Sequence, residues 1–142
     1  MLRVPDDVLL DIFYFYVVED FDPRGLRISQ WIRLAQVCRR WRGVVFQSPH
    51  RLNLRLVCTN RTPARDTLDI WPPFPLIIRN IIGYRRLGRS GVDNIIAALE
   101  RNDRVSQIKL SWFSTSEFDR LTNSAAMQKP FPELTVLLLE KD

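Results

Sequence analysis

An apolar pattern that occurs twice near the C-terminus constrains the fold of this chain more than any other feature. Val105-x-x-Ile108-x-Leu110 matches Leu134-x-x-Leu137-x-Leu139, and the displacement along the chain is the same at every position. Alternating apolar residues predict a strand at each site. A fixed displacement between two strands indicates consecutive strand–helix units, because one such unit cannot bury its apolar face alone and must stack on another.

The same displacement extends toward the N-terminus. Stepping back from Val105 reaches Leu76, where the apolar segment Leu76–Ile78 begins, and a further, shorter step reaches Leu52, in an alternating segment that ends at Leu56. Strand and helix are therefore expected to alternate about four times over residues 52–139. The alternative is an ordinary βαβ arrangement with accidental spacing. Both interpretations predict a parallel sheet with right-handed crossovers.

Local signals place the helices between these strands. Thr62-Pro63 is typical of an N-cap followed by a first-turn proline and predicts a short helix. A loop over Gly83–Gly91 is expected to lead into a helix over Val92–Arg101. Ser114 with Glu117 fits a capping box, which predicts the start of a third helix.

The last apolar run, Leu137-Leu138-Leu139, is expected at an uncapped edge of the sheet. Stacked repeats normally carry a polar terminal cap, and bare apolar edges favour aggregation. We therefore expect the chain to be a truncated or abbreviated member of a longer design.

Residues 1–50 have helical spacing and are predicted to form a separate helical domain, with 51–142 as the repeat-like region. Pro5 and the carboxylates after it predict a helix start. Apolar residues then recur three and four apart over 8–16. After a loop over Glu19–Ile28, Ser29 is the expected N-cap of a helix through Trp41, with a break at Gly43.

Residues 4–46 resemble the F-box. The family's motifs appear here as Val4-Pro5, Leu9, Ile12-Phe13 and, most specifically, Val37-Cys38-Arg39-Arg40-Trp41-Arg42. Val4 replaces the usual leucine, and the linker Val18–Ser29 is longer than is typical. The resemblance implies an α+β chain, in which a three-helix F-box-like module precedes a short leucine-rich-repeat-like stack.

The resemblance also implies a function. F-box proteins dock on a Skp-type adaptor, and through it on a cullin, as substrate receptors of SCF-type ubiquitin ligases; repeats downstream bind the protein substrate. The positions that match the family's packing and adaptor-contact positions are Pro5, Leu9, Ile12, Phe13, Leu34, Val37, Cys38 and Trp41. Among them we expect Pro5, Leu9 and Val37 at the interface, and Ile12 and Trp41 in the core.

Two alternatives remain open. The formal net charge is +5 and 18 of the 21 basic residues are arginine, which suits phosphate contacts and allows an Arg-rich nucleic-acid-binding module. The other is a truncated F-box protein without a working substrate domain.

Catalysis, cofactors and membrane insertion are not expected. Cys38, Cys58 and His50 match no metal-ligand spacing, so we expect two free thiols and no metal. Cys38 is expected on an apolar helical face, where a thiol is inert. The chain has neither a spanning apolar run nor a signal peptide. We expect an intracellular protein, cytoplasmic or nuclear.

Overall fold

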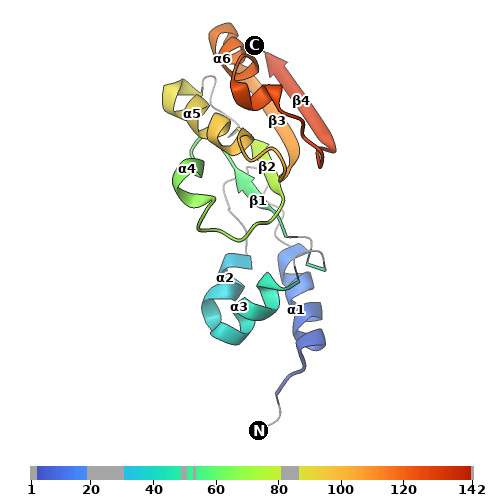
Figure 1. Ribbon diagram of the computed structural model, residues 1–142. Coiled ribbons are helices and arrows are strands. Elements are labelled where there is room, and N and C mark those ends of the chain that lie inside the picture. The colour runs from blue at the N-terminus through green and yellow to red at the C-terminus, as the bar shows by residue number, and fades with distance from the viewer. Residues whose placement is uncertain (1–2, 19–30, 49–50, 53, 81–86, 142) are drawn as a thin grey trace. The chain divides into compact units, whose positions relative to one another are not determined.

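The computed structural model describes residues 3–18, 31–48, 51–52, 54–80 and 87–141. The chain divides into two compact units, Met1–Arg55 and Leu56–Asp142. Figure 1 shows helices in the first unit and alternating strands and helices in the second. This order confirms the predicted α+β class, with a three-helix module followed by a repeat-like stack.

The described part of the first unit consists of α1 (Asp6–Val18), α2 (Trp31–Val37) and α3 (Arg39–Phe46). As predicted, α1 starts directly after Pro5, whose carbonyl accepts a hydrogen bond from Leu9 N at 3.1 Å. Asp6 and Asp7 occupy the first turn, where carboxylates complement the positive end of the helix dipole. The expected loop over 19–28 and the expected cap at Ser29 lie outside the described residues.

The predicted single helix through Trp41 is wrong, because the helix is interrupted at Cys38 and forms two helices, α2 and α3. This residue has an extended backbone (φ −160°, ψ 170°) and its Sγ accepts a hydrogen bond from Trp41 N at 3.5 Å, so it serves as the N-cap of α3. The expected break at Gly43 is also wrong. Gly43 lies inside α3 and accepts a hydrogen bond from Gln47 N at 3.1 Å.

Aromatic side chains fill the core of the helical unit. Phe13, Trp31 and Val45 are buried. The ring centroids of Phe13 and Trp41 lie 4.9 Å apart in a tilted arrangement, and those of Trp31 and Phe46 lie 6.1 Å apart. Offset and edge-on pairs of this kind add about 0.5–1.5 kcal/mol beyond the area they bury.

The second unit is a four-stranded parallel sheet in the order β1-β2-β3-β4, with helices between the strands. Its elements are β1 (Leu56–Cys58), α4 (Ala64–Thr67), β2 (Leu76–Arg79), α5 (Gly88–Leu99), β3 (Val105–Phe113), α6 (Thr115–Thr122), the 3₁₀ helix η1 (Ala125–Gln128) and β4 (Val136–Lys141). The predicted parallel sheet is confirmed.

The register of the sheet bears out the fixed displacement between the last two strands. Ile108 pairs with Leu137, and Leu110 pairs with Leu139. Leu76 likewise lies opposite Val105. The expected equivalence of Leu76 with Leu52 on the preceding strand is wrong, since Leu76 pairs with Leu56.

The first strand begins later than its alternating sequence predicts. Leu52 lies in a turn closed by a hydrogen bond from its N–H to Ser48 O at 3.1 Å, and β1 starts only at Leu56. Thr62 is not the N-cap of α4, because Pro63 occupies that position; the Thr62 hydroxyl instead accepts a hydrogen bond from Thr59 N at 2.9 Å. The one-turn helix α4 starts after Pro63.

The capping box at Ser114 is confirmed, and its glutamate also reaches the start of another helix. The Glu117 carboxylate accepts hydrogen bonds from Ser114 N and Gly88 N, both at 3.2 Å, and from Leu87 N at 3.4 Å. Backbone N–H groups at a helix start have no partner within the helix, so this carboxylate stabilises α5 as well as α6. It explains why α5 starts at Gly88 rather than at the predicted Val92.

Candidate docking surface of the helical unit

Helix α1 leaves one apolar stripe exposed. Its members Val8, Ile12 and Phe15 are four and three residues apart and so lie on one face of the helix. Of their surfaces, 45%, 54% and 69% remain exposed. Val4, just before the helix, is exposed as well. We call these four residues the α1 stripe. Exposed apolar side chains gathered on one helix face are a feature typical of interaction surfaces.

The opposite face of α1 is the one that the unit buries. Leu9, Leu10 and Phe13 are all at most 7% exposed. The burial of this face fixes the helix's rotation about its own axis, and therefore fixes which apolar side chains stay outside.

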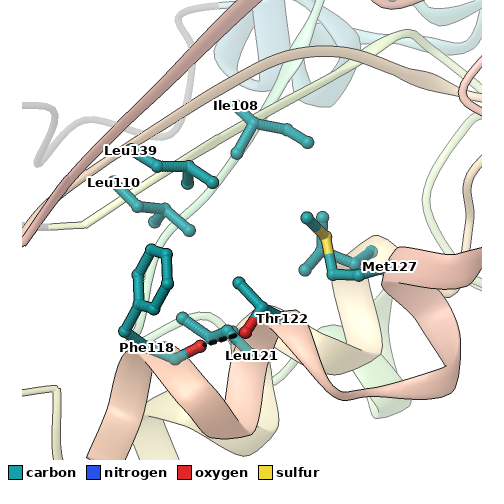
Figure 2. Close-up of a pocket in the computed structure, with 8 residues that line it drawn as sticks. Ile108, Leu110, Phe118, Leu121, Thr122, Met127 and Leu139 are labelled. Carbon is teal, nitrogen blue, oxygen red and sulfur yellow. Dashed lines mark hydrogen bonds between the residues drawn. The ribbon is translucent and has the colours of Figure 1, made fainter. Parts of the chain in front are cut away.

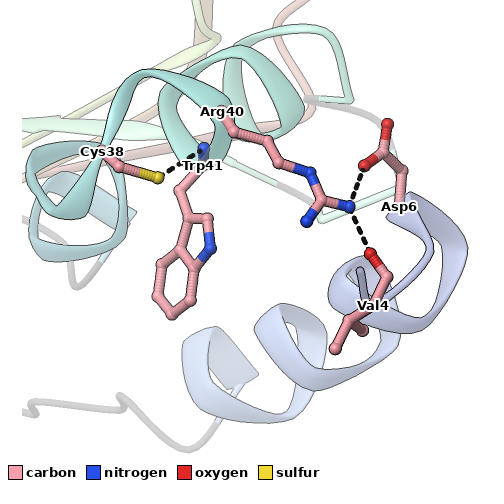
Figure 3. A network of polar contacts seen from close by, with 5 residues as sticks. All are labelled: Val4, Asp6, Cys38, Arg40 and Trp41. Carbon is pink, nitrogen blue, oxygen red and sulfur yellow. Dashed lines mark hydrogen bonds and ion pairs between the residues drawn. The ribbon is translucent and has the colours of Figure 1, made fainter. Parts of the chain in front are cut away.

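Arginines hold the N-terminal half of α1 in place. The Arg40 guanidinium donates hydrogen bonds to Val4 O and to Asp6 Oδ1, the latter at 2.8 Å, which joins α3 to the start of α1 (Figure 3). Arg51 pairs with Asp11 at 3.0 Å and with Asp7 at 3.4 Å. Each such exposed pair contributes at most about 1 kcal/mol. Together the two arginines pair with all three carboxylates of α1.

The structure separates the predicted adaptor-binding residues into two groups. Four are exposed: Pro5, Ile12, Val37 and Cys38. Three are buried, namely Leu9, Phe13 and Leu34, and Trp41 is half-buried against Phe13. The structure brings the buried group together as the core and leaves the exposed group on the surface of the same unit.

Two of the expected core and interface assignments need correction. Leu9, expected at an interface, is 5% exposed and belongs to the core. Ile12, expected in the core, is 54% exposed. Cys38, expected on an inert apolar face, is exposed at the α2–α3 break. Sequence reasoning missed Val8 and Phe15 as surface residues, because the nearly uniform apolar sequence of α1 carries no signal that separates them from the buried Leu9 and Phe13.

The Cys58 thiol is unsuited to nucleophilic chemistry at neutral pH. Both cysteines are free. Burial raises the pKa of the Cys58 thiol to about 11, against a smaller opposing effect of the nearby Arg104 guanidinium. A thiol with this pKa stays protonated at neutral pH, and the thiolate is the reactive form. No group of three His, Cys, Asp or Glu side chains that could hold a metal is found among the residues that the structure describes.

A small hollow in the second unit is apolar and too small for a ligand. Its free space is about that of one water molecule. The residues that line it are Leu99, Ile108, Leu110, Phe118, Leu121, Thr122, Met127 and Leu139 (Figure 2). The Thr122 hydroxyl, the one polar side-chain group in this lining, donates to Phe118 O at 2.9 Å and so stays within its own helix.

The comparisons with known proteins locate the family likeness in the helical unit. Residues 1–52 match the model of the F-box-like family. No curated protein matches the chain, and no solved structure matches it. The matched segment contains all three helices and the α1 stripe. Within the described ranges, none of the helices has the length and apolar character needed to cross a bilayer.

Proposed function

We propose that this chain, which carries an F-box-like domain at residues 1–52, is a substrate receptor of an SCF-type ubiquitin ligase. F-box domains generally bind Skp-type adaptors. In this proposal the helical unit binds such an adaptor and, through it, a cullin, while the second unit binds the protein to be ubiquitinated. The chain itself performs no catalysis and works inside the cell, where these ligases act.

The α1 stripe is the observation that carries the proposal. A helix whose apolar side chains occur at spacings of four and three residues is the form in which proteins insert a helix into a partner's apolar groove. Fully burying an Ile or Phe side chain is worth about 1.5–3 kcal/mol. More than half of Ile12 and of Phe15 is still exposed, so most of that gain is still available to a partner.

The second unit suits the substrate-binding role. Strands β3 and β4 repeat in register, and their separation along the chain falls at the long end of the leucine-rich-repeat period. Stacked units of this type present an extended sheet face, on which side chains from several strands lie side by side. We therefore assign the substrate to this unit and describe it as a short leucine-rich-repeat-like stack.

Reconstitution from purified components tests the proposal. The full chain, a Skp-type adaptor and its cullin are mixed and separated by gel filtration; we expect one complex that contains all three. The variant with both Ile12→Asp and Phe15→Asp is expected to elute alone. Ile70→Asp is the matched control, because Ile70 is also an exposed apolar residue but lies in the second unit. Failure of the unmodified chain to join the adaptor would refute the proposal.

A further inference from the structure

The sheet of the second unit has two faces, one that contributes to the buried core and one that carries charged, polar and apolar side chains. Along each strand, successive side chains point alternately to these two faces. On β3 the core side chains are Ile108 and Leu110, and the side chains between and before them, Lys109 and Gln107, are exposed or half-buried. The register places the following side chains on this same face, which we call the open face: Val57, Ile77, Arg79, Gln107, Lys109, Ser111, Val136, Leu138 and Glu140.

Two cations lie directly opposite each other on the open face. Arg79 of β2 pairs with Lys109 of β3 in the register of the sheet, so their backbones are about 4.8 Å apart. Like charges in this position are destabilising. Among the described residues neither side chain takes part in an ion pair within 4.0 Å, and Glu140, the carboxylate on this face, is not paired with either of them.

The Arg79 guanidinium shows a second sign of a missing partner. Its Nε is buried and has no hydrogen-bond partner in the described part of the chain. Buried donors are nearly always satisfied in folded proteins, so an unsatisfied one calls for an explanation. An anion placed between Arg79 and Lys109 would remove the repulsion between the two cations, and a rotation of the guanidinium that brings Nε to this anion would satisfy the donor.

The surroundings of the two cations indicate what carries this anion. Ile77 precedes Arg79 by two residues on the same face, and Leu138 lies next to Lys109 on β4. Both are apolar, and Leu138 is 44% exposed. A nucleic acid would need a longer series of cations with aromatic side chains for stacking. Beside Glu140 and the neutral polar Gln107 and Ser111, the described part of the open face offers two cations flanked by apolar side chains, which fits a peptide with acidic and apolar residues.

We propose that the open face binds an acidic segment of a protein substrate, with an aspartate or glutamate carboxylate held between Arg79 and Lys109 and apolar side chains on either side. The planar guanidinium can donate two parallel hydrogen bonds to one carboxylate, and the ammonium adds a point charge. This inference rests on the proposed function, because it names the class of substrate that the second unit receives.

A peptide titration of the full chain, followed by NMR, tests the inference. The probe is a short peptide of alternating leucine and glutamate, and its control replaces each glutamate with glutamine. We expect the glutamate peptide to shift the amide signals of Arg79, Gln107 and Lys109, and to bind about tenfold more tightly than the glutamine peptide. Equal binding of the two peptides, or no glutamate-dependent binding up to millimolar concentration, would overturn the inference.

Variants connect the binding to the two cations. Lys109→Gln is expected to raise the Kd of the glutamate peptide about three- to fivefold, since Lys109 is exposed, and Arg79→Gln is expected to raise it about tenfold. Lys109→Gln should not lower the melting temperature, because it removes a like-charge contact. Lys129→Gln, an exposed lysine outside the sheet, is the control. If Lys129→Gln lowers the affinity for the glutamate peptide as much as Lys109→Gln does, general charge attraction is responsible and the specific site is refuted.

Two further measurements separate this inference from its competitors. If a single-stranded oligonucleotide displaces the glutamate peptide and loses affinity in Lys109→Gln, the open face is a nucleic-acid site and the inference is wrong. Adaptor binding is measured on the same variants. If the unmodified chain binds the adaptor but not the glutamate peptide, only the proposed substrate class is refuted. If the unmodified chain does not bind the adaptor, the proposed function is refuted.

Discussion

Truncation of Phe15 should weaken adaptor binding without weakening the fold. Phe15 is 69% exposed, and fully burying such a side chain is worth about 1.5–3 kcal/mol. The exposed part therefore corresponds to about 1–2 kcal/mol, and Phe15→Ala should raise the Kd for the adaptor about 5- to 30-fold. Because the side chain is on the surface, the free energy of unfolding should change by less than about 0.5 kcal/mol.

Leu9→Ala is the informative comparison for this prediction. Leu9 is one turn from the stripe residue Ile12 but is buried in the unit's core. Its truncation should lower the free energy of unfolding by about 2–5 kcal/mol. Any loss of adaptor binding should then follow the loss of folded protein, as circular dichroism would show.

Isothermal titration calorimetry, with urea unfolding of the same samples, distinguishes the two effects. The α1 stripe is not the docking surface if Phe15→Ala and Ile12→Ala both bind the adaptor as tightly as the unmodified chain. If Phe15→Ala unfolds the helical unit, the side chain belongs to the core and its assignment to the stripe is wrong.

Three further predictions concern stability and chemistry. Glu117→Ala should lower the free energy of unfolding by about 1–2 kcal/mol in urea, and by more than Ser114→Ala, because its carboxylate caps two helices; equal losses would contradict this. Arg40→Ala should cost at most about 1 kcal/mol in the same assay, and a larger loss would mean that its contacts with α1 are stronger than their exposure indicates. Iodoacetamide at mildly basic pH should label Cys38 and spare Cys58 until the protein unfolds. Burial raises the pKa of Cys58 from 9.0 to about 11, so between these pH values the folded protein keeps a proton that the unfolded chain has lost. The free energy of unfolding should therefore fall as the pH rises from 9.0 to about 11, and an unchanged urea midpoint over this range would contradict the raised pKa.

Local hydrogen bonding and register were predictable from the sequence. Ser114 and Glu117 form the expected capping box, because both of its hydrogen bonds join groups three residues apart. The pairing of Ile108 with Leu137 also follows from the sequence, since a one-residue slip would turn the apolar side chains of the strand to the wrong face.

The exposed face of α1 was not predictable in the same way. Residues 8–18 are almost all apolar, so their spacing alone does not distinguish Leu9 from Ile12. The packing of α2 and α3 decides which side is covered. Cys38 illustrates a second limit: an extended backbone ends α2 there, and a thiol is not among the side chains that usually cap a helix.

Hydrogen–deuterium exchange of the unmodified chain, with and without a Skp-type adaptor, reports on whether the adaptor covers the α1 stripe. We expect slower exchange of the α1 amides between Val8 and Phe15 when the adaptor is present. Unchanged exchange across this segment, with the adaptor at saturating concentration, would contradict the claim that the stripe is its docking surface.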